Sequence, residues 1–572
     1  MTMTAPDRPG PPAPPGPPRR RPNILLLFVD QMRFDAMGCA GNGVLRTPAL
    51  DRLAGEGMHF THAVTPTPVC IAARQSLITG HFSGVHGRYA NNVVLPEPLL
   101  PTLPQLLGSA GYVTHAIGKM HFRPPRRHYG FQRMELMEEI PSYREEDEYL
   151  LYLKREGYGH IRQVHGVRNL LYHQPQVSVI PEAHHGSTWV ADRTVEFLRQ
   201  HARYYAPGGG AGRPFFCWSS WIAPHLPWNA PEPFASLYPL DAVDPPYAWD
   251  QARETLPPSL RQNKATADLE FASPDHLRRI KALYYGNVSL IDKGIGRILE
   301  TLDTLGLAED TIVVFSSDHG EMMGDHGLMQ KSKPYDAAAR IPFLLRYPGR
   351  VQPGRRSAER VSLTDLLPTF LDAAGVAYPA ELGLPQPPGA SLLGRPGGGL
   401  ATPREAFVIA EGAGARRWWS ILRGPWKYSY YAQGGWEELF HLGDDPREMR
   451  NLLLDGGPLA PEARREGDAL RAQIVEWERA HGFPSSFDAA GRLVRAPAGV
   501  GGAVLTTNGQ FPTWVENLPP DERAQMESWG DSVLNAMRQE RTFALTDLNL
   551  AAFKRAGGSL EGSEQQRLLD AL

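Results

Sequence analysis

"NILLLFVD" (Asn23 to Asp30) is an unbroken apolar run that stops at an acid, and "TIVVFSSDHG" (Thr311 to Gly320) repeats this form. An apolar run without alternation is typical of a strand buried on both faces, as in a parallel sheet covered by helices. A third run of this kind, "RPFFCWSSWIAPH", lies at Arg213 to His225. The three stretches predict the core of a mainly parallel sheet.

Helical patterns lie between these predicted strands. "TPALDRLAGEG" has Thr47 as a candidate cap and Pro48 at the first helical position. "TLPQLLGSAGY" has the same layout from Thr102, and Val288 to Leu307 carries apolar residues at helical spacing. Strands that alternate with helices predict an α/β fold, with a large, mainly parallel or mixed sheet flanked by helices.

The character of the sequence changes after about Tyr378. "ELGLPQPPGASLLGRPGGG" indicates a long loop or linker, and the following "RRWWSILRGPWKYSYYAQGGWEELFHL" alternates aromatic and polar residues between turn signals. This second stretch predicts a small antiparallel sheet. We expect four units: a disordered Pro-rich tail (1–21), an α/β catalytic domain (22–380), a subdomain with the small sheet (381–483), and an extension (484–572) that contacts another copy of the chain or covers the mouth of the site.

The composition excludes several classes of partner. The net charge of −3 over 572 residues gives no bulk attraction to nucleic acid or to an anionic membrane. The longest apolar runs fall far short of the roughly 20 residues of a membrane span. The three cysteines form no disulfide framework and fit a reducing compartment. The run Ile24 to Val29 is too short for the apolar region of a signal peptide, so we expect a cytoplasmic protein.

Acids stand at the ends of the predicted strands, where open α/β sheets bind ligands. Asp30 or Asp318 alone is explained equally well as a helix cap. Together, with His319 directly after Asp318, they predict a shared metal site. Candidate ligands are Asp30, Gln31, Asp318 and His319. Their carboxylate and amide oxygens suit calcium, magnesium or manganese, and the imidazole favours manganese.

Basic residues could complete an anion site beside this metal. Lys119 and His121 lie two apart in "GKMHF", so on an extended segment both side chains point to one side. His225 lies in "PHLPW", and Lys331 and Lys333 lie in "QKSKP". Each residue alone is more simply a surface charge or a core histidine. The whole set indicates metal-assisted chemistry on an anion.

Cys70 opens a further motif, "CIAARQSLITG". An isolated cysteine is ordinarily a small buried apolar residue rather than a reagent. Seven motifs stand in one order from Asn23 to Leu452: "NILLLFVDQ", "TPVCIAARQSLITG", "HGRYANN", "GKMHF", "PHLPW", "SSDHGEMMGDHG" and "ELFHLGDDPREMRNL". In this order the chain resembles the formylglycine-dependent sulfatases of the alkaline-phosphatase superfamily. The resemblance implies an alkaline-phosphatase-like fold and a sulfuric ester hydrolase.

The resemblance also implies a role for Cys70. A maturation enzyme would oxidise it to formylglycine, reading the Ala variant of a Cys-x-Pro-x-Arg signal over Cys70 to Arg74. The hydrate of this aldehyde carries two hydroxyls, one to attack sulfur and one to expel sulfate afterwards. Residue 70 would join the metal ligands, which the resemblance gives as Asp30, Gln31, Cys70, Asp318 and His319 with calcium or manganese.

The other roles follow from the same resemblance. Arg74 would hold the hydrate, Lys119 the sulfate, and His121 would take the proton of the second hydroxyl. His225 and Lys331 would face the leaving-group oxygen, and the spacing from Asp318 favours Lys331 over Lys333. A further contact to the transferred group would come from Asn91, for which a simple turn is an equal explanation.

Three functions remain open at this point. The Asp30–Gln31 pair is similar to that of choline sulfatases and phosphonate monoester hydrolases, whereas "GKMHF" is the sulfatase pattern. The leading hypothesis is hydrolysis of a small-molecule sulfate ester. The alternatives are a phosphonate monoester or phosphodiester hydrolase with the same nucleophile, and an unmodified, non-catalytic relative that binds metal and anion. We expect the loops Arg123 to Asp147 and Val164 to His185 to form the pocket walls, and a homo-oligomer is possible.

Overall fold

The computed structural model describes residues 21–91, 100–166, 168, 172–173, 175–205, 212–261, 273–454, 460–498, 515 and 517–524. Its centre is an eight-stranded sheet with the order β10-β2-β9-β8-β1-β6-β3-β4. The strands are β1 (Asn23–Asp30), β2 (Met58–Val64), β3 (Val113–Gly118), β4 (Arg133–Leu136), β6 (Phe215–Pro224), β8 (Thr311–Ser317), β9 (Phe343–Arg346) and β10 (Arg355–Ser362). All neighbouring pairs are parallel except those of β9, so the predicted mainly parallel or mixed sheet is confirmed.

Helices cover both faces of this large sheet. Alternate residues of β1 enter two different cores: Leu25 and Leu27 pack with one set of helices, and Leu26 and Phe28 pack with the other. The first set is α1 (Pro48–Glu56), α6 (Gly186–Tyr205) and α8 (Pro274–Thr304), and the second is α2 (Cys70–Thr79), α4 (Leu103–Ser109) and α10 (Leu366–Ala374). Burial of both faces explains why the sequence of this strand does not alternate.

Two details of the predicted helices differ in the structure. Thr47 is the N-cap residue of α1, as predicted, but its hydroxyl makes no capping hydrogen bond and instead accepts one from Gly38 N at 2.8 Å. The carboxylate of Asp292 in α8 takes that role, because it accepts from Ala49 N at 3.1 Å and Leu50 N at 2.8 Å. The helix predicted from Val288 begins much earlier, at Pro274. The sequence does not reveal this start, because the first half of the helix buries polar and aromatic residues that hide the apolar period.

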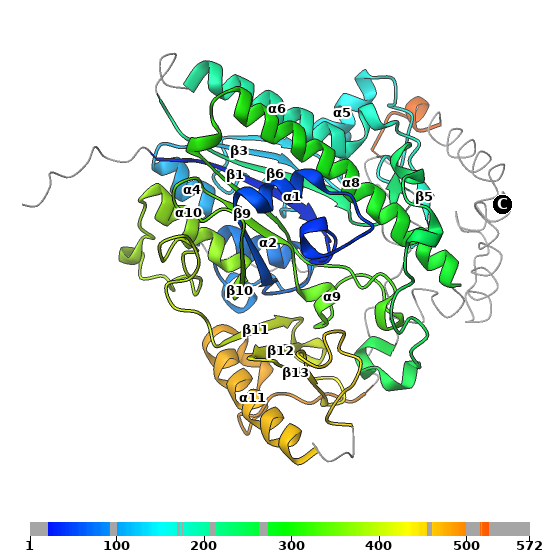
Figure 1. Ribbon diagram of the computed structural model, residues 1–572, viewed down its shortest axis with the longest axis vertical. Coiled ribbons are helices and arrows are strands. Elements are labelled where there is room, and N and C mark those ends of the chain that lie inside the picture. The colour runs from blue at the N-terminus through cyan, green and yellow to red at the C-terminus, as the bar shows by residue number, and fades with distance from the viewer. Residues whose placement is uncertain are drawn as a thin grey trace, which may run out of the picture.

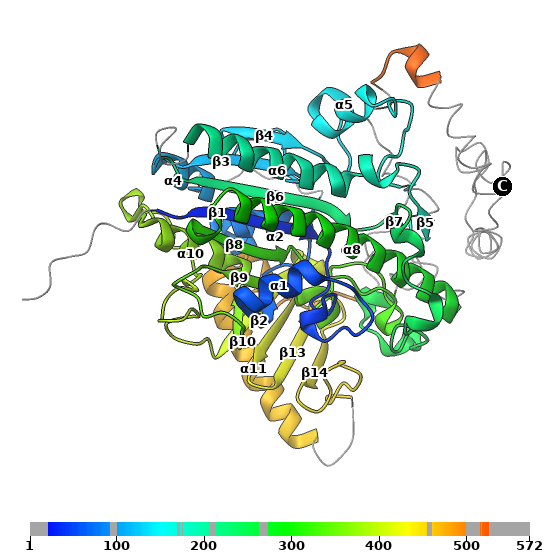
Figure 2. The ribbon, with the colours of Figure 1, turned by 45° about the horizontal axis from the view of Figure 1, so that its top comes forward.

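A separate four-stranded antiparallel sheet, here called the small sheet, confirms the second predicted sheet. Its strands are β11 (Ala406–Glu411), β12 (Trp418–Arg423), β13 (Trp426–Tyr431) and β14 (Trp436–His441). It lies with α11 (Ala460–His481) below the large sheet in both views (Figure 1 and Figure 2). Ala410 at the end of β11 donates its N–H to Pro66 O at 3.1 Å and accepts from Thr67 Oγ1 at 2.8 Å. The small sheet therefore touches the segment that leads into Cys70.

The remaining elements are short. They are α3 (Ser83–His86), α5 (Glu148–Arg155), α9 (Asp336–Ala339), β5 (Gln176–Val177) and β7 (Asn229–Ala230), together with several 3-10 turns. Within the described part of the chain, no helix combines the length and the apolar character needed to cross a membrane. The expected disordered tail and most of the expected C-terminal extension lie outside the described residues.

A buried ion cluster joins the small sheet to the main body. Lys427 Nζ of β13 lies 2.7 Å from Asp336 Oδ1 at the start of α9 and 2.6 Å from Glu448 Oε1.

Removing one partner of a buried ion cluster leaves the others uncompensated, which costs about 3–5 kcal/mol. We expect Lys427→Met to lower the free energy of unfolding by about that amount, measured by urea titration of tryptophan fluorescence. Lys154→Met is the control, because Lys154 is an exposed partner of Glu522. Equal stability of wild type and Lys427→Met would contradict the assigned role.

Candidate active site

The candidate residues meet at the carboxyl ends of four neighbouring strands. Asp30 ends β1, Asp318 follows β8, Lys119 follows β3 and His225 follows β6. Cys70 reaches the same place as the first residue of α2. All five are buried. The topology thus brings together residues that lie up to 288 positions apart, as strand-end reasoning predicted for the two acids.

Four side chains form a compact group of potential metal ligands. One ligand atom each from Asp30, Cys70, Asp318 and His319 lies within 4.8 Å of all the others. Cys70 Sγ is 3.1 Å from His319 Nε2 and 3.7 Å from Asp30 Oδ1. His319 Nδ1 donates to Gly320 O at 2.9 Å, which leaves the lone pair of Nε2 directed at the group. Two carboxylates and an imidazole fit a divalent cation.

The outer oxygens of the two acids are held by cations. Arg74 Nε lies 2.9 Å from Asp318 Oδ2, and Arg74 Nη2 lies 3.3 Å from Asp30 Oδ2. Lys119 Nζ lies 2.6 Å from the same Asp30 oxygen. His319 Nε2 is 3.8 Å from Asp30 Oδ1 and 3.7 Å from Asp318 Oδ1. Each carboxylate therefore uses Oδ2 for a basic residue and turns Oδ1 toward the ligand group.

Both acids are ionised at neutral pH. Burial and the charge of Asp318 would raise the pKa of Asp30, but Lys119, His225 and Arg74 hold it below its ordinary value. Burial would also raise the pKa of Asp318, but His319, Arg74 and Lys119 bring it well below the usual range. The site thus presents two carboxylates that need no proton loss before they bind a cation.

Cys70 is a protonated thiol in this environment. Burial, with the adjacent Asp30 charge, raises its pKa to about 12. A neutral thiol is a poor nucleophile. The first turn of α2 is held by Asn91, whose Oδ1 accepts from Ile71 N at 3.0 Å. Asn91 therefore lies beside the start of α2, where its side chain contacts the backbone.

Lys119 and His121 reach the site by a different path from the expected one. β3 ends at Gly118, and His121 has a left-handed φ of 56°, so the premise of two alternating strand positions is wrong. His121 N donates to Glu138 Oε1 at 2.8 Å, while the ring atom Nδ1 is buried with no hydrogen-bond partner among the described residues. Burial and the charge of Lys119 hold the pKa of His121 well below its usual value. The ring is therefore neutral at pH 7.

His225 and Lys331 form a pair on one side of the site. Their atoms Nε2 and Nζ are 2.6 Å apart. His225 Nδ1 donates to Leu226 O at 2.5 Å, so Nε2 accepts the proton of the Lys331 ammonium. Burial and the Lys331 charge keep the pKa of His225 well below its usual value, so the positive charge rests on the lysine. Lys333, the alternative lysine, instead donates to Met329 O and to Lys331 O.

Two acidic residues at the site had no signal in the sequence. Glu139 Oε2 lies 2.5 Å from Lys119 Nζ, and its Oε1 lies 2.6 Å from Arg168 Nη2. Glu321 is fully buried and accepts from the Gln31 side-chain amide. Glu139 comes from the loop Arg123 to Asp147, which was expected to form a pocket wall, and Glu321 from the loop after β8. Loop carboxylates follow no periodicity, so only their position in space identifies them.

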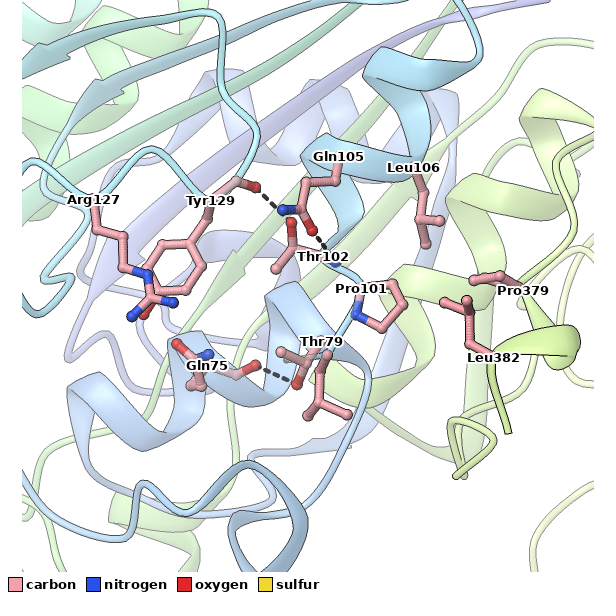
Figure 3. Close-up of a pocket in the computed structure, with 11 residues that line it drawn as sticks. Gln75, Thr79, Pro101, Thr102, Gln105, Leu106, Arg127, Tyr129, Pro379 and Leu382 are labelled. Atoms are coloured by element: carbon pink, nitrogen blue, oxygen red, sulfur yellow. Dashed lines mark hydrogen bonds between the residues drawn. The ribbon is translucent and has the colours of Figure 1, made fainter. Parts of the chain in front are cut away.

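A separate cavity lies apart from this group. It has a volume of about 400 Å³ and lies beside α2 and α4, where Arg127 and Tyr129 face Gln75 and Thr79 (Figure 3). None of the candidate site residues lines it. The chemistry is therefore assigned to the buried group at the strand ends, on the basis of its contacts.

Three comparisons relate the chain to known proteins. A family model described as sulfatase matches residues 22–376. An arylsulfatase of Clostridium perfringens is 32% identical over 474 residues, which cover 80% of this chain and 94% of the relative. A choline-sulfatase of Rhizobium meliloti is 28% identical and covers 86% and 93%, respectively. In structure, the phosphonate monoester hydrolase of Agrobacterium radiobacter aligns with a TM-score of 0.66 at 23% identity, over 81% of this chain and 96% of that one.

Proposed function

The chain belongs to the sulfatase family and is a sulfuric ester hydrolase, and from this premise we propose that it cleaves sulfate monoesters with a formylglycine made from Cys70 and one divalent ion. The position of Cys70 carries the proposal. Its Sγ lies 3.1 Å from His319 Nε2, inside the group of potential metal ligands. Arg74, one helical turn further along α2, pairs with both acids of that group. A buried core cysteine would need none of these neighbours.

The proposed oxidation of Cys70 changes its chemistry. A neutral thiol attacks poorly, whereas an aldehyde hydrate offers two hydroxyls. In the first step, one hydroxyl oxygen bonds to sulfur and the alcohol leaves. In the second, the other hydroxyl loses its proton, the carbonyl re-forms and the carbon–oxygen bond to sulfate breaks. A bound calcium or manganese ion would polarise a sulfate oxygen and lower the pKa of the attacking hydroxyl.

The residues around Cys70 divide the remaining work. Lys119 and Arg74 place positive charge against the sulfate and the hydrate. We assign to His121 the uptake of the second hydroxyl's proton, because its buried Nδ1 has no hydrogen-bond partner among the described residues. Lys331 carries the proton of its pair with His225, and we assign it as the group that stabilises or protonates the leaving oxygen. His225 holds that ammonium in place.

A second candidate function is hydrolysis of phosphonate monoesters or phosphodiesters. The Asp30–Gln31 pair favours it, because this pair is similar to that of phosphonate monoester hydrolases, one of which shares the fold. The same nucleophile and cations would serve both reactions. A panel of sulfate, phosphonate and phosphate esters, assayed with protein from its native host, separates the two by the ratio of kcat/KM values.

The nucleophile itself is tested by mass spectrometry of the tryptic peptide Leu53 to Arg74. Loss of the sulfur and gain of a carbonyl oxygen would support the proposal, and with it a maturation enzyme as a partner. An intact thiol in a protein that binds metal but turns over no ester of the panel would favour the non-catalytic alternative.

Truncation before Ser485, followed by size measurement, tests whether the extension builds a homo-oligomer.

Removal of the metal should abolish turnover. After dialysis against EDTA we expect sulfate ester hydrolysis to fall at least about 100-fold, because Asp30 and Asp318 then repel the anionic substrate. Calcium or manganese should restore the rate, and the more effective ion identifies the natural one. The control is the same dialysis without chelator. Full activity in protein shown by elemental analysis to be metal-free would contradict the metal site.

A further inference from the structure

Glu321 fixes the orientation of the Gln31 amide. Gln31 Nε2 donates to Glu321 Oε2, and on the other side Gln31 Oε1 accepts from Lys331 Nζ at 2.8 Å. A carboxylate can only accept a hydrogen bond and an ammonium can only donate one. Both neighbours therefore select the same orientation of the amide, with its nitrogen toward Glu321 and its oxygen toward Lys331.

Glu321 is itself held rigidly. It is fully buried, and its other oxygen, Oε1, accepts from Met323 N at 2.8 Å and from Gln330 N at 2.5 Å. Gln330 directly precedes Lys331 in the chain. One carboxylate thus orients the Gln31 side chain and also closes the loop that carries Lys331.

Gln31 lies beside the metal-ligand group. It follows Asp30, and its backbone N–H donates to Asp318 Oδ1 at 3.0 Å. A side-chain amide binds a cation through its oxygen, because its nitrogen has no free lone pair. With the opposite orientation of the amide, the NH₂ group would face Lys331, and the side chain would no longer serve as a ligand.

From these contacts we propose that Glu321 is a positioning residue for the metal site: it fixes the Gln31 amide so that its oxygen is available to the ion. The inference rests on the metal-binding part of the proposed function. Outer partners of this kind typically contribute about 10–100-fold to metal affinity.

The variant Glu321→Gln preserves the size of the side chain but conflicts with its surroundings. If the oxygen of the new amide accepted from Met323 N and Gln330 N, its NH₂ group would face the NH₂ group of Gln31. If Gln31 then turned, its NH₂ group would face the ammonium of Lys331. Every orientation leaves two donors opposed or a backbone N–H without an acceptor.

The test measures the dissociation constants of calcium and of manganese by competition with a chromogenic chelator. We expect Glu321→Gln to bind about 10–100-fold more weakly than the wild type. Glu438→Gln is the matched control, since Glu438 is also a buried carboxylate that accepts from two hydroxyls, those of Tyr335 and Tyr431, but lies in the small sheet. Its metal affinity should equal that of the wild type.

A double-mutant cycle distinguishes positioning from general damage to the loop. In a Gln31→Ala background, Glu321→Gln should weaken metal binding no further, because the amide that it orients is absent. An equal loss in both backgrounds, or wild-type affinity in Glu321→Gln, would overturn the inference. Since binding is measured without turnover, these results are separate from the catalytic proposal. A wild type that binds neither ion would overturn the proposed metal site itself, and this inference with it.

Discussion

Replacing Cys70 with alanine should remove sulfate ester hydrolysis almost completely, with kcat/KM at least about 10⁴-fold below wild type. The loss follows because alanine can form no aldehyde and therefore no hydrate, whereas Arg74, Lys119 and the metal ligands stay in place. The Cys70 thiol contacts Asp30 and His319, which other partners also hold. The variant should therefore fold, and its thermal midpoint should change little.

Cys217→Ala is the control for this experiment. Cys217 is also fully buried, but it lies within β6, in the apolar core on the α6 side of the large sheet. This variant should lose some stability through its small cavity and keep its turnover. Hydrolysis by Cys70→Ala at a substantial fraction of the wild-type rate would exclude residue 70 as the nucleophile.

Replacing Lys119 with alanine should produce the second-largest loss, about 10³-fold in kcat/KM for sulfate esters. Lys119 Nζ lies between Asp30 Oδ2 at 2.6 Å and Glu139 Oε2 at 2.5 Å, with its side chain completely buried. Without the ammonium, both carboxylates face the space that we assign to the sulfate. The charge there changes from attractive to repulsive toward an anion.

The Lys119 experiment needs both kinetic constants and a fold control. Loss of kcat as well as a rise in KM is expected, since the charge on sulfate oxygens changes during transfer. Lys119→Arg should recover part of the rate if positive charge is what matters. The exposed Lys154→Ala should behave as the wild type. Unchanged hydrolysis of sulfate esters by Lys119→Ala would remove the sulfate-binding role.

The strands and the acids at their ends could be predicted because they obey local rules. β1, β6 and β8 are mainly apolar and do not alternate, since both of their faces are buried, and a buried parallel strand places its last residue at the ligand-binding edge. The identity of Cys70 as a site residue needed the ordered set of motifs. No rule of composition or period distinguishes it from the core residue Cys217.

Other features depend on partners that are distant in the chain. The capping carboxylate of α1 comes from Asp292, over 240 positions away, and the local sequence around Thr47 gives no sign of it. His121 has a left-handed backbone conformation that turns the chain, and an alternating sequence pattern gives no sign of such a turn. Glu139 and Glu321 lie in loops, where a carboxylate is ordinarily a solvated charge. Their burial follows only from the assembled fold.

The contact of the small sheet with the segment before Cys70 has a consequence for biosynthesis. Cys70 is fully buried, and the sheet that abuts Pro66 and Thr67 ends its first strand at Glu411. Cys70 and Glu411 are separated by about 340 positions. At ~5–20 residues per second, the ribosome needs roughly 20–70 s to make the stretch between them. Domains fold as they emerge, so the maturation enzyme that we propose for Cys70 would have this interval before the small sheet packs against Pro66 and Thr67. Slower translation between these positions should raise the converted fraction of the protein, and faster translation should lower it.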